Sequence, residues 1–191
     1  MATTIELIEP RTPRLQLRQW RDADLPAFAA LNADEQVMEH LVGPLSQAQS
    51  DAMAQQIREL IAQRGWGFWA VERIADGRFL GFVGLHTPSP DLPCAPCVEV
   101  GWRLVRDAWG QGLATEAAQA ALQVGFERLR LEEIVAFTAT GNLRSQAVMH
   151  RLGMEHVPAR DFEHPLLPAG HRLRPHRLFR LTAEQYRRTH V

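Results

Sequence analysis

The chain has 191 residues, of which 46% are hydrophobic and 23% charged, so neither a disordered nor a fibrous chain is indicated. We expect a single domain over residues 1–191, with a core from about 11 to 182, because this length is typical of one domain. The 21 basic residues face 22 acidic ones at a net charge of −1, which excludes a global attraction to nucleic acid, and all 21 are Arg, which excludes a lysine nucleophile.

Apolar and polar side chains alternate over residues 14–18, which predicts a strand with one face toward a core. A helix should follow, because Asp22 or Asp24 can cap it and Pro26 is tolerated in a first turn. Its apolar residues at near-helical spacing are Phe28, Leu31 and Met38.

A second amphipathic helix is predicted over residues 46–63, ending at Gly65. The period then changes to that of strands at 66–74 and 79–86. The Asp-Gly pair at 76–77 lies between these two strands, so a hairpin is expected there.

Residues 87–96 hold four prolines and should form a loop. Cys94 and Cys97 stand at its end, directly before a predicted strand over 97–105. A zinc site needs about four ligands, and a redox motif of this spacing should open a helix. We therefore interpret the two thiols as incidental.

The second half of the chain predicts a helix over 113–129, a strand over 133–140, a short helix over 142–152 and a strand over 177–181. The resulting element order is that of a mixed α/β domain. No signal peptide and no apolar run of about 18 residues is present, which favours a cytoplasmic protein without membrane contact.

The strand at 97–105 leads into a Gly-x-Gly turn and then into a helix that starts with small residues. Such a turn lets backbone N–H groups converge on a phosphate at the positive end of the helix dipole. Gly110 and Gly112 remove Cβ atoms where a pyrophosphate would approach. The pattern alone is equally explained by a glycine-rich helix cap, and neither a P-loop nor a third glycine of a dinucleotide motif is present.

Two longer motifs make the resemblance specific. Residues 99–102, Glu-Val-Gly-Trp, and 109–117, Trp-Gly-Gln-Gly-Leu-Ala-Thr-Glu-Ala, resemble the acetyl-CoA motif of the GCN5-related N-acetyltransferases. Residues 142–154 are similar to the Asn-x-x-Ser helix, ending in Leu-Gly-Met, of the branch that contains the ribosomal-protein-alanine N-acetyltransferases. The element order of that family matches the chain over about residues 11–182.

The resemblance implies a mixed, mostly antiparallel central sheet of about six to seven strands, splayed between the fourth and fifth, with about four flanking helices. It also implies acetyl-CoA as co-substrate and no metal. Main-chain groups near Leu104 and Val105 would bond the pantetheine arm, amides of residues 111–115 the pyrophosphate, and Asn142 the cofactor from the opposite side. The candidate cofactor-binding residues are Leu104, Val105, Gly110, Gln111, Gly112, Leu113, Ala114, Thr115 and Asn142.

Glu99 and Ser145 are the candidate catalytic residues. In the family a Glu on this strand is a proposed base, and the alternative for Glu99 is a salt-bridged or solvent-facing residue. Ser145 could protonate the departing thiolate, or it could cap its helix. The chain departs from the wider family at Trp109, where many members have Arg or Gln, and at Met149, where many carry a Tyr proposed as the acid.

Several residues keep two interpretations. His164, His171 and His176 lie in an Arg-rich segment over 160–180, which is either a solvated loop and strand or a surface for an acidic partner. We expect Trp66, Phe68 and Trp69 to belong to the core, although one of them could line the acceptor cleft.

The sequence therefore predicts transfer of an acetyl group from acetyl-CoA to a primary amine, with a protein N-terminal amine as the first choice. A small-molecule amine, such as an antibiotic, polyamine or amino acid, is the alternative, and a non-catalytic CoA- or nucleic-acid-binding module is a more distant one. We expect a monomer or homodimer, with nucleic acid not favoured as a partner.

Overall fold

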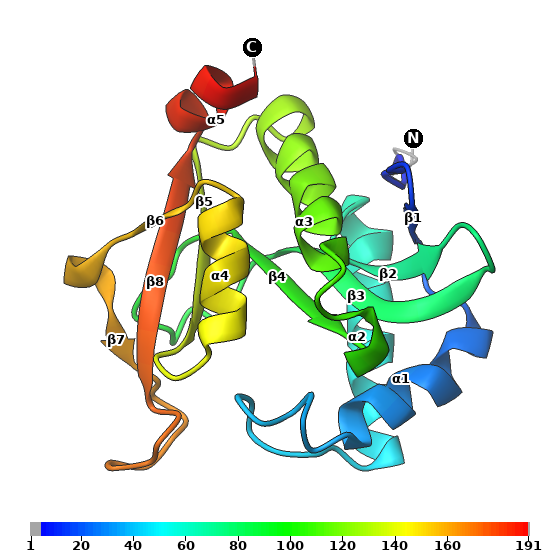
Figure 1. Cartoon of the computed structure of the whole chain (residues 1–191), viewed down its shortest axis with the longest axis horizontal. Coiled ribbons are helices and arrows are strands. Elements are labelled where there is room, and N and C mark those ends of the chain that lie inside the picture. Colours follow the sequence, from blue (N-terminus) through cyan, green and yellow to red (C-terminus); the bar gives the residue numbers. More distant parts are fainter. Residues whose placement is uncertain (1–4, 191) are drawn as a thin grey trace. The chain divides into compact units, whose positions relative to one another are not determined.

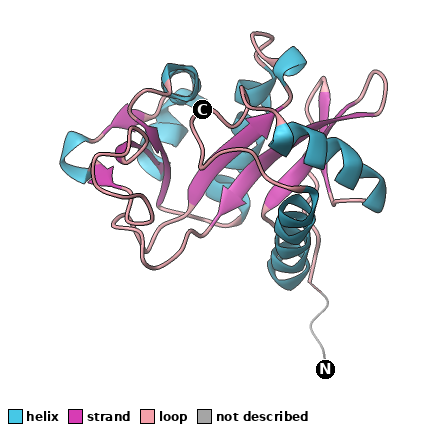
Figure 2. Cartoon of the chain, turned by 90° about the horizontal axis from the view of Figure 1, so that it is seen from below, coloured by secondary structure: helices cyan, strands magenta, loops and turns pink. Residues whose placement is uncertain are grey.

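The computed structural model describes residues 5–190, which form two compact units. Unit 1 comprises Met1–Leu85 and Gly101–Ala121, and unit 2 comprises His86–Val100 and Leu122–Val191. Both units combine helices with strands (Figures 1 and 2).

Unit 1 is built on strands in the order β1-β2-β3-β4, namely β1 (Leu15–Arg18), β2 (Phe68–Arg73), β3 (Arg78–His86) and β4 (Glu99–Leu104), of which β4 begins in unit 2. The pairs β1–β2 and β2–β3 are antiparallel. Gly77 has φ +67° in the turn between β2 and β3, a conformation that glycine adopts without strain. The predicted hairpin is therefore confirmed.

The helices of unit 1 are η1 (Asp22–Asp24), α1 (Leu25–Ala33), α2 (Gln47–Arg64) and η2 (Arg106–Ala108). Ser46 caps α2 by accepting the N–H of Gln49 at 3.3 Å, and Gly65 ends it at φ +83°. The extension of the first helix to Met38 is wrong, because α1 ends at Ala33 and Met38 is buried from a turn region. Spacing alone could not detect this end.

An aromatic cluster fills the core of unit 1. The ring of Phe28 meets Trp20 edge-on at 4.8 Å between centroids and Phe82 at 6.0 Å. Trp69 is fully buried and donates its indole N–H to the Ile8 carbonyl at 2.7 Å. The core role expected for Trp69 is therefore confirmed, whereas Phe68 is half-buried.

Unit 2 contains the antiparallel pair β5 (Glu133–Ala139) and β8 (Pro175–Thr182). Two short strands, β6 (Glu155–His156) and β7 (Phe162–Glu163), also pair antiparallel with β8. The first residue of β4, Glu99, pairs in parallel with Val135 of β5, and this is the single Cα pair between these fully described strands. The limited pairing agrees with the predicted separation of the fourth and fifth strands.

The helical segments that follow the Gly-x-Gly turn are α3 (Leu113–Gln123), which starts in unit 1, then η3 (Val124–Arg128), α4 (Leu143–Arg151), η4 (Pro158–Arg160) and α5 (Ala183–His190). Tyr186 of α5 stacks on Phe126 at 4.8 Å and donates its hydroxyl to Glu127 at 3.0 Å. This last helix was not predicted from the sequence.

The fold class is mixed α/β with a mostly antiparallel sheet, as predicted, but the described residues form eight strands and five α-helices. The extra strands have two residues each, too short for any period to show. Within residues 5–190 no helix combines the length and apolar character that crossing a membrane requires. The cytoplasmic location stays a prediction.

A buried ion pair fastens β1 to the turn before α1. Arg18 donates to both carboxylate oxygens of Asp24, at 2.7 and 2.8 Å, and its Nε donates to Glu72 at 2.7 Å. The Asp24 side chain is 4% exposed, whereas Asp22 in the same turn is 85% exposed and pairs with Arg58 at 2.7 Å.

Asp24→Asn should lower the free energy of unfolding by about 3 kcal/mol, because it leaves a buried guanidinium partly uncompensated. Asp22→Asn is the matched control and should cost less than about 1 kcal/mol. Urea denaturation of both variants tests this, and equal losses would contradict it.

Candidate functional site

The main chain at the end of β4 has one edge bound and one edge open. The N–H of Val105 donates to the Leu80 carbonyl of β3 at 2.9 Å. Since neighbouring residues of a strand point their polar groups to opposite edges, Leu104 faces away from β3. Its carbonyl accepts the indole N–H of Trp109 at 2.8 Å. The Leu104 N–H is therefore the donor that points away from β3, whereas both polar groups of Val105 are used, since its carbonyl accepts the N–H of Ala108 at 3.0 Å.

The turn after β4 is shaped by two left-handed glycines. Gly110 has φ +72° and Gly112 has φ +76°, and α3 begins directly afterwards at Leu113. The first amides of a helix have no intrahelical partner, and the helix dipole makes this end attractive to anions. The residues predicted to bind the pyrophosphate, 111–115, thus form one contiguous turn and helix start in unit 1.

Arg14 holds this turn in place and was missed by the sequence analysis. Its Nη1 donates to the Gln111 carbonyl at 3.0 Å, and its Nε donates to Glu116 of α3 at 2.5 Å. Thr12 donates to the same carboxylate at 2.6 Å. Burial acts to raise the pKa of Glu116, but the hydrogen bonds from Thr12 and Arg14 outweigh it and keep that pKa below its usual range. About a hundred residues separate the partners, so no local pattern could reveal them.

In unit 2, Asn142 is the N-cap of α4, so the cap role considered for Ser145 belongs to Asn142. Its Oδ1 accepts the N–H of Ser145 at 3.2 Å, and its Nδ2 donates to Thr138 at 3.0 Å and to the Ser145 hydroxyl at 3.1 Å. Both Nδ2 hydrogens are thereby used, and a further ligand of Asn142 would have to donate to Oδ1. Met149 is a core residue, 2% exposed.

Glu99 at the start of β4 is half-buried, and no hydrogen bond or ion pair of its carboxylate occurs within the described part of the chain. Burial, followed by the negative charge that Cys94 can carry, raises the pKa of Glu99 to about 8. Within residues 5–190 Glu99 therefore forms no salt bridge, which was one of the two alternatives to a role as base. A carboxyl group with this pKa exchanges its proton near neutral pH, as a general base must.

Cys94 and Cys97 are free thiols in unit 2. A hydrogen bond from Cys97 lowers the pKa of Cys94 to about 7, with Arg160 adding to the effect, and the same bond raises the pKa of Cys97. Cys94 packs in a small apolar cluster with Val135 and Leu178. The two thiols thus belong to the apolar packing around Val135, and the charge that Cys94 can carry contributes to the raised pKa of Glu99.

The histidines predicted to cluster do so in part. The rings of His164 and His176 lie 5.1 Å apart, with Phe162 stacked on His176 at 5.4 Å. Burial lowers the pKa of both histidines, so they stay neutral over a wider pH range. His171 instead accepts the N–H of Leu173 at 3.2 Å. In the part of the chain that the structure describes, no group of three or more potential ligands could hold a metal ion.

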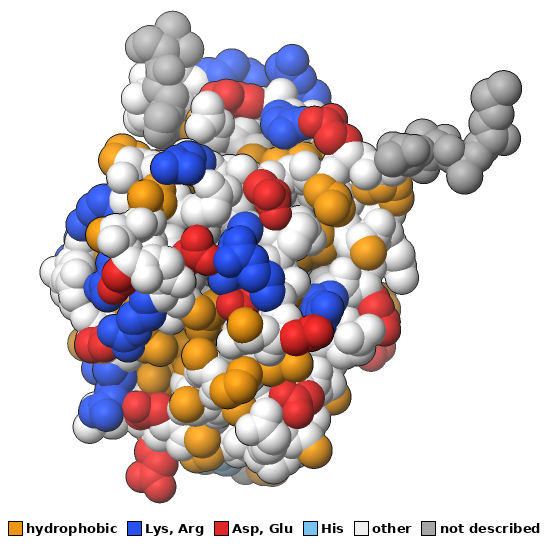
Figure 3. All heavy atoms as spheres, turned by 90° about the vertical axis from the view of Figure 1, so that its right-hand side faces the viewer, with side chains coloured by type: hydrophobic (Ala, Val, Ile, Leu, Met, Phe, Trp, Pro, Cys, Tyr) orange, Lys and Arg blue, Asp and Glu red, His pale blue; other side chains and the backbone are white. Residues whose placement is uncertain are grey.

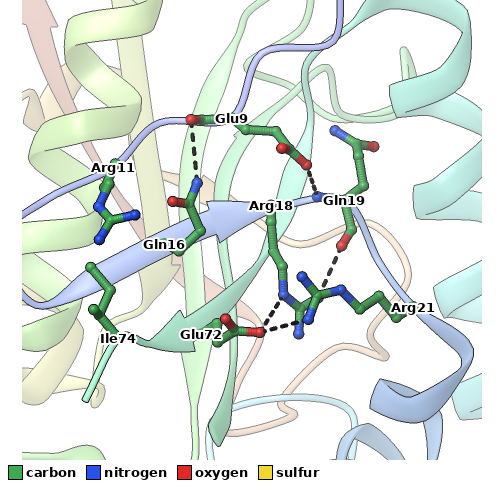
Figure 4. Close-up of a pocket in the computed structure, with 8 residues that line it drawn as sticks. All are labelled: Glu9, Arg11, Gln16, Arg18, Gln19, Arg21, Glu72 and Ile74. Carbon is green, nitrogen blue, oxygen red and sulfur yellow. Dashed lines mark hydrogen bonds and ion pairs between the residues drawn. The ribbon is translucent and has the colours of Figure 1, made fainter. Parts of the chain in front are cut away.

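The pocket in Figure 4 has a volume of about 450 Å³ and lies in unit 1, and its lining includes no residue of the glycine turn. Three of its charged residues are paired, since Arg18 and Arg21 both donate to Glu72, at 2.7 and 2.9 Å. On the face drawn in Figure 3, basic and acidic side chains are interspersed rather than gathered by sign. We assign the pocket to structure rather than to ligand binding.

Comparisons with known proteins agree with the motifs. Residues 14–155 match the model of the acetyltransferase (GNAT) domain family. The chain is 30% identical over 146 residues to the uncharacterized protein YkkB of Bacillus subtilis, covering 76% of this chain and 84% of that protein. It is 36% identical to FsC-acetyl coenzyme A-N(2)-transacetylase of Aspergillus fumigatus, over 49% of this chain but 40% of the relative.

Among solved structures, the chain resembles RimL, a ribosomal L7/L12 alpha-N-protein acetyltransferase in complex with coenzyme A. The TM-score is 0.73 at 18% identity, covering 92% of this chain and 98% of RimL. This likeness concerns the fold.

Gly112→Val should weaken acetyl-CoA binding by about 10-fold or more, because a β-branched residue strains the left-handed backbone that aims the amides. The added Cβ itself has room, with Arg14 Nη2 as its nearest neighbour at 3.7 Å. Gly77→Val is the matched control, since Gly77 has φ +67° and open space around it. Both variants should lose stability, but calorimetry should show weaker binding for Gly112→Val alone. Equal affinities would contradict the assignment.

Proposed function

Because the chain belongs to the GNAT acetyltransferase family and is an acetyl-CoA-dependent N-acetyltransferase, we propose that its acceptor is a primary amine at the N-terminus of a protein. The observation that carries the proposal for the donor side is the strand, glycine turn and helix start of unit 1, where free amides follow two left-handed glycines. Acetyl-CoA is a co-substrate here, and its pyrophosphate suits these amides.

Two similarities support a protein acceptor. The motif at 142–154 resembles the branch of ribosomal-protein acetyltransferases, and RimL, which acts on a ribosomal protein, shares the fold. A small-molecule amine is the second candidate.

In the proposed reaction the neutral amine nitrogen attacks the thioester carbonyl carbon and forms a tetrahedral oxyanion. The open-edge N–H of Leu104 is our candidate donor to this oxyanion, because its strand neighbour Val105 is already bound to β3. The carbon–sulfur bond then breaks, the acetyl group stays on nitrogen, and the CoA thiolate takes up a proton.

Glu99 is our candidate for the group that accepts the proton of the amine, directly or through a water. Its pKa of about 8 lies close to the pKa of an N-terminal amine, about 7.7 to 8, so proton transfer between them is nearly balanced. Ser145 is our candidate donor to the departing thiolate. Its hydroxyl accepts a hydrogen bond from Asn142, which leaves the hydroxyl proton available.

An assay of thiol release tests the acceptor. Peptides with a free N-terminal amine should be acetylated with a kcat/KM at least about 10-fold above that of polyamines, aminoglycosides and free amino acids, if the site is built for a chain end. N-terminally blocked versions of the same peptides are the control and should be inert. A preference for a small amine would establish the second candidate. Lack of thiol release with every amine would favour a non-catalytic module.

Glu99→Gln should lower kcat by about 10²-fold at pH 7 if Glu99 is the base. The wild-type rate should rise with pH through about 8, because the carboxyl group must lose its proton to act, and the deficit of the variant should shrink where solvent already deprotonates the amine. Acetyl-CoA affinity should be unchanged.

A stability measurement separates this role from a structural one. The folded pKa of Glu99 lies above the ordinary value of 4.5, so the unfolded state loses its proton first as pH rises, and the carboxyl group destabilises the fold increasingly between about 4.5 and 8. Glu99→Gln should therefore gain thermal stability relative to wild type over this window. Full activity of the variant at every pH would disprove the base assignment.

A further inference from the structure

Arg103 of β4 is surrounded by neutral groups. Its Nη1 donates to Oδ1 of Asn32 in α1 at 2.6 Å and approaches the Met53 sulfur in α2 at 3.8 Å. The guanidinium carbon lies 5.3 Å from the centroid of the Phe82 ring. Within the described residues no carboxylate forms an ion pair with Arg103.

The comparison with Arg18 shows how unusual this is within unit 1. Arg18 is buried, whereas Arg103 is half-buried, and Arg18 is matched by the carboxylates of Asp24 and Glu72. Hydrogen bonding to Asp24 raises the pKa of Arg18, whereas burial lowers the pKa of Arg103 to about 10, with no carboxylate opposing it. Arg103 is still a cation at neutral pH, and an unpaired buried cation destabilises a protein.

The protein nevertheless holds the guanidinium of Arg103 in a fixed position. Asn32 is fully buried, and its amide nitrogen donates to the hydroxyl of the fully buried Ser50 at 2.9 Å. This bond turns the amide oxygen of Asn32 toward Arg103. A relay from α2 through α1 therefore orients a cation for which unit 1 provides no counter-ion.

The guanidinium of Arg103 also has N–H donors that make no hydrogen bond. Its Nε is buried without a partner. In unit 2, Nε of Arg174 and Nε of Arg180 also make no hydrogen bond, but both residues have an ion pair, Arg174 Nε with Glu163 at 3.0 Å and Arg180 Nη1 with Glu133 at 3.7 Å. Arg103 as a whole is only half-buried, so part of the residue is in contact with solvent.

We propose that Arg103 binds a carboxylate of the acceptor, so that the preferred substrates are amines that carry a carboxylate close to the reacting nitrogen. This inference rests on the proposed function, because Arg103 directly precedes Leu104, our candidate donor to the oxyanion. The planar fork of Arg suits a carboxylate, which accepts two parallel N–H groups. A peptide with an acidic residue next to its N-terminus has this chemistry.

Two amidated peptides, Ala-Glu-Ala-Ala and Ala-Gln-Ala-Ala, differ by this one charge. The wild-type enzyme should favour the Glu peptide by at least about 10-fold in kcat/KM, mostly through KM. Arg103→Gln should abolish the preference, since Gln removes the charge but keeps an N–H that can reach Asn32. Arg103→Lys should retain part of it, because Lys keeps the charge without the fork.

Arg58→Gln is the matched control. Arg58 lies on α2, and its ion pair with Asp22 is exposed, so this variant loses a positive charge without changing the surroundings of Arg103. It should keep the wild-type preference. Calorimetry of the Glu peptide in the presence of CoA measures binding independently of turnover, because no acetyl group can be transferred from CoA. If Arg103→Gln folds poorly, the same measurement can compare Arg103→Lys with the wild type.

Equal kcat/KM values for the two peptides in the wild-type enzyme would overturn the carboxylate site while leaving the acetyltransferase function intact. A loss of acetyl-CoA affinity in Arg103→Gln, with the peptide preference unchanged, would also overturn it and would make Arg103 a contact of the CoA phosphates. Lack of turnover with both peptides and with every other amine would count against the proposed function instead.

Discussion

The bond between the Trp109 indole and the Leu104 carbonyl, 2.8 Å long, determines how the chain leaves β4. It satisfies the last carbonyl of the strand, which points away from β3. The left-handed glycines and the start of α3 follow immediately. With Arg14 fastened to Gln111 and Glu116, the turn that we assign to the pyrophosphate is held from both sides.

The strand β4 also carries two ionisable residues of opposite charge, Glu99 and Arg103, and neither has an ion-pair partner in the described structure. Glu99 lacks a cationic partner in the described structure and has a pKa raised to about 8, and Arg103 lacks an anionic one and has a pKa lowered to about 10. Both are costly for stability, and the protein balances its other buried charges, as the Arg18 network shows. Unbalanced groups of this kind are expected at functional sites, where a substrate supplies the missing partner.

The sequence predicted what local patterns encode. The Asp-Gly hairpin, the end of α2 at Gly65 and the glycine turn were found because each depends on residues next to one another. It did not predict the partners of Arg14 or the relay from Ser50 through Asn32 to Arg103, since these contacts join distant segments. The role of Trp109 was likewise invisible, because an indole hydrogen bond to a strand carbonyl leaves no period. The cap of α4 was assigned to Ser145 as an alternative, although Asn142 provides it.

The central claim is that the amides after β4 bind the pyrophosphate of acetyl-CoA. Amide hydrogen exchange, resolved by residue with and without acetyl-CoA, tests this most directly. The account predicts that exchange slows at residues 111–115, because N–H groups without an intrahelical partner gain a bound phosphate oxygen. Unchanged exchange at these amides, with acetyl-CoA shown to be bound, would contradict it.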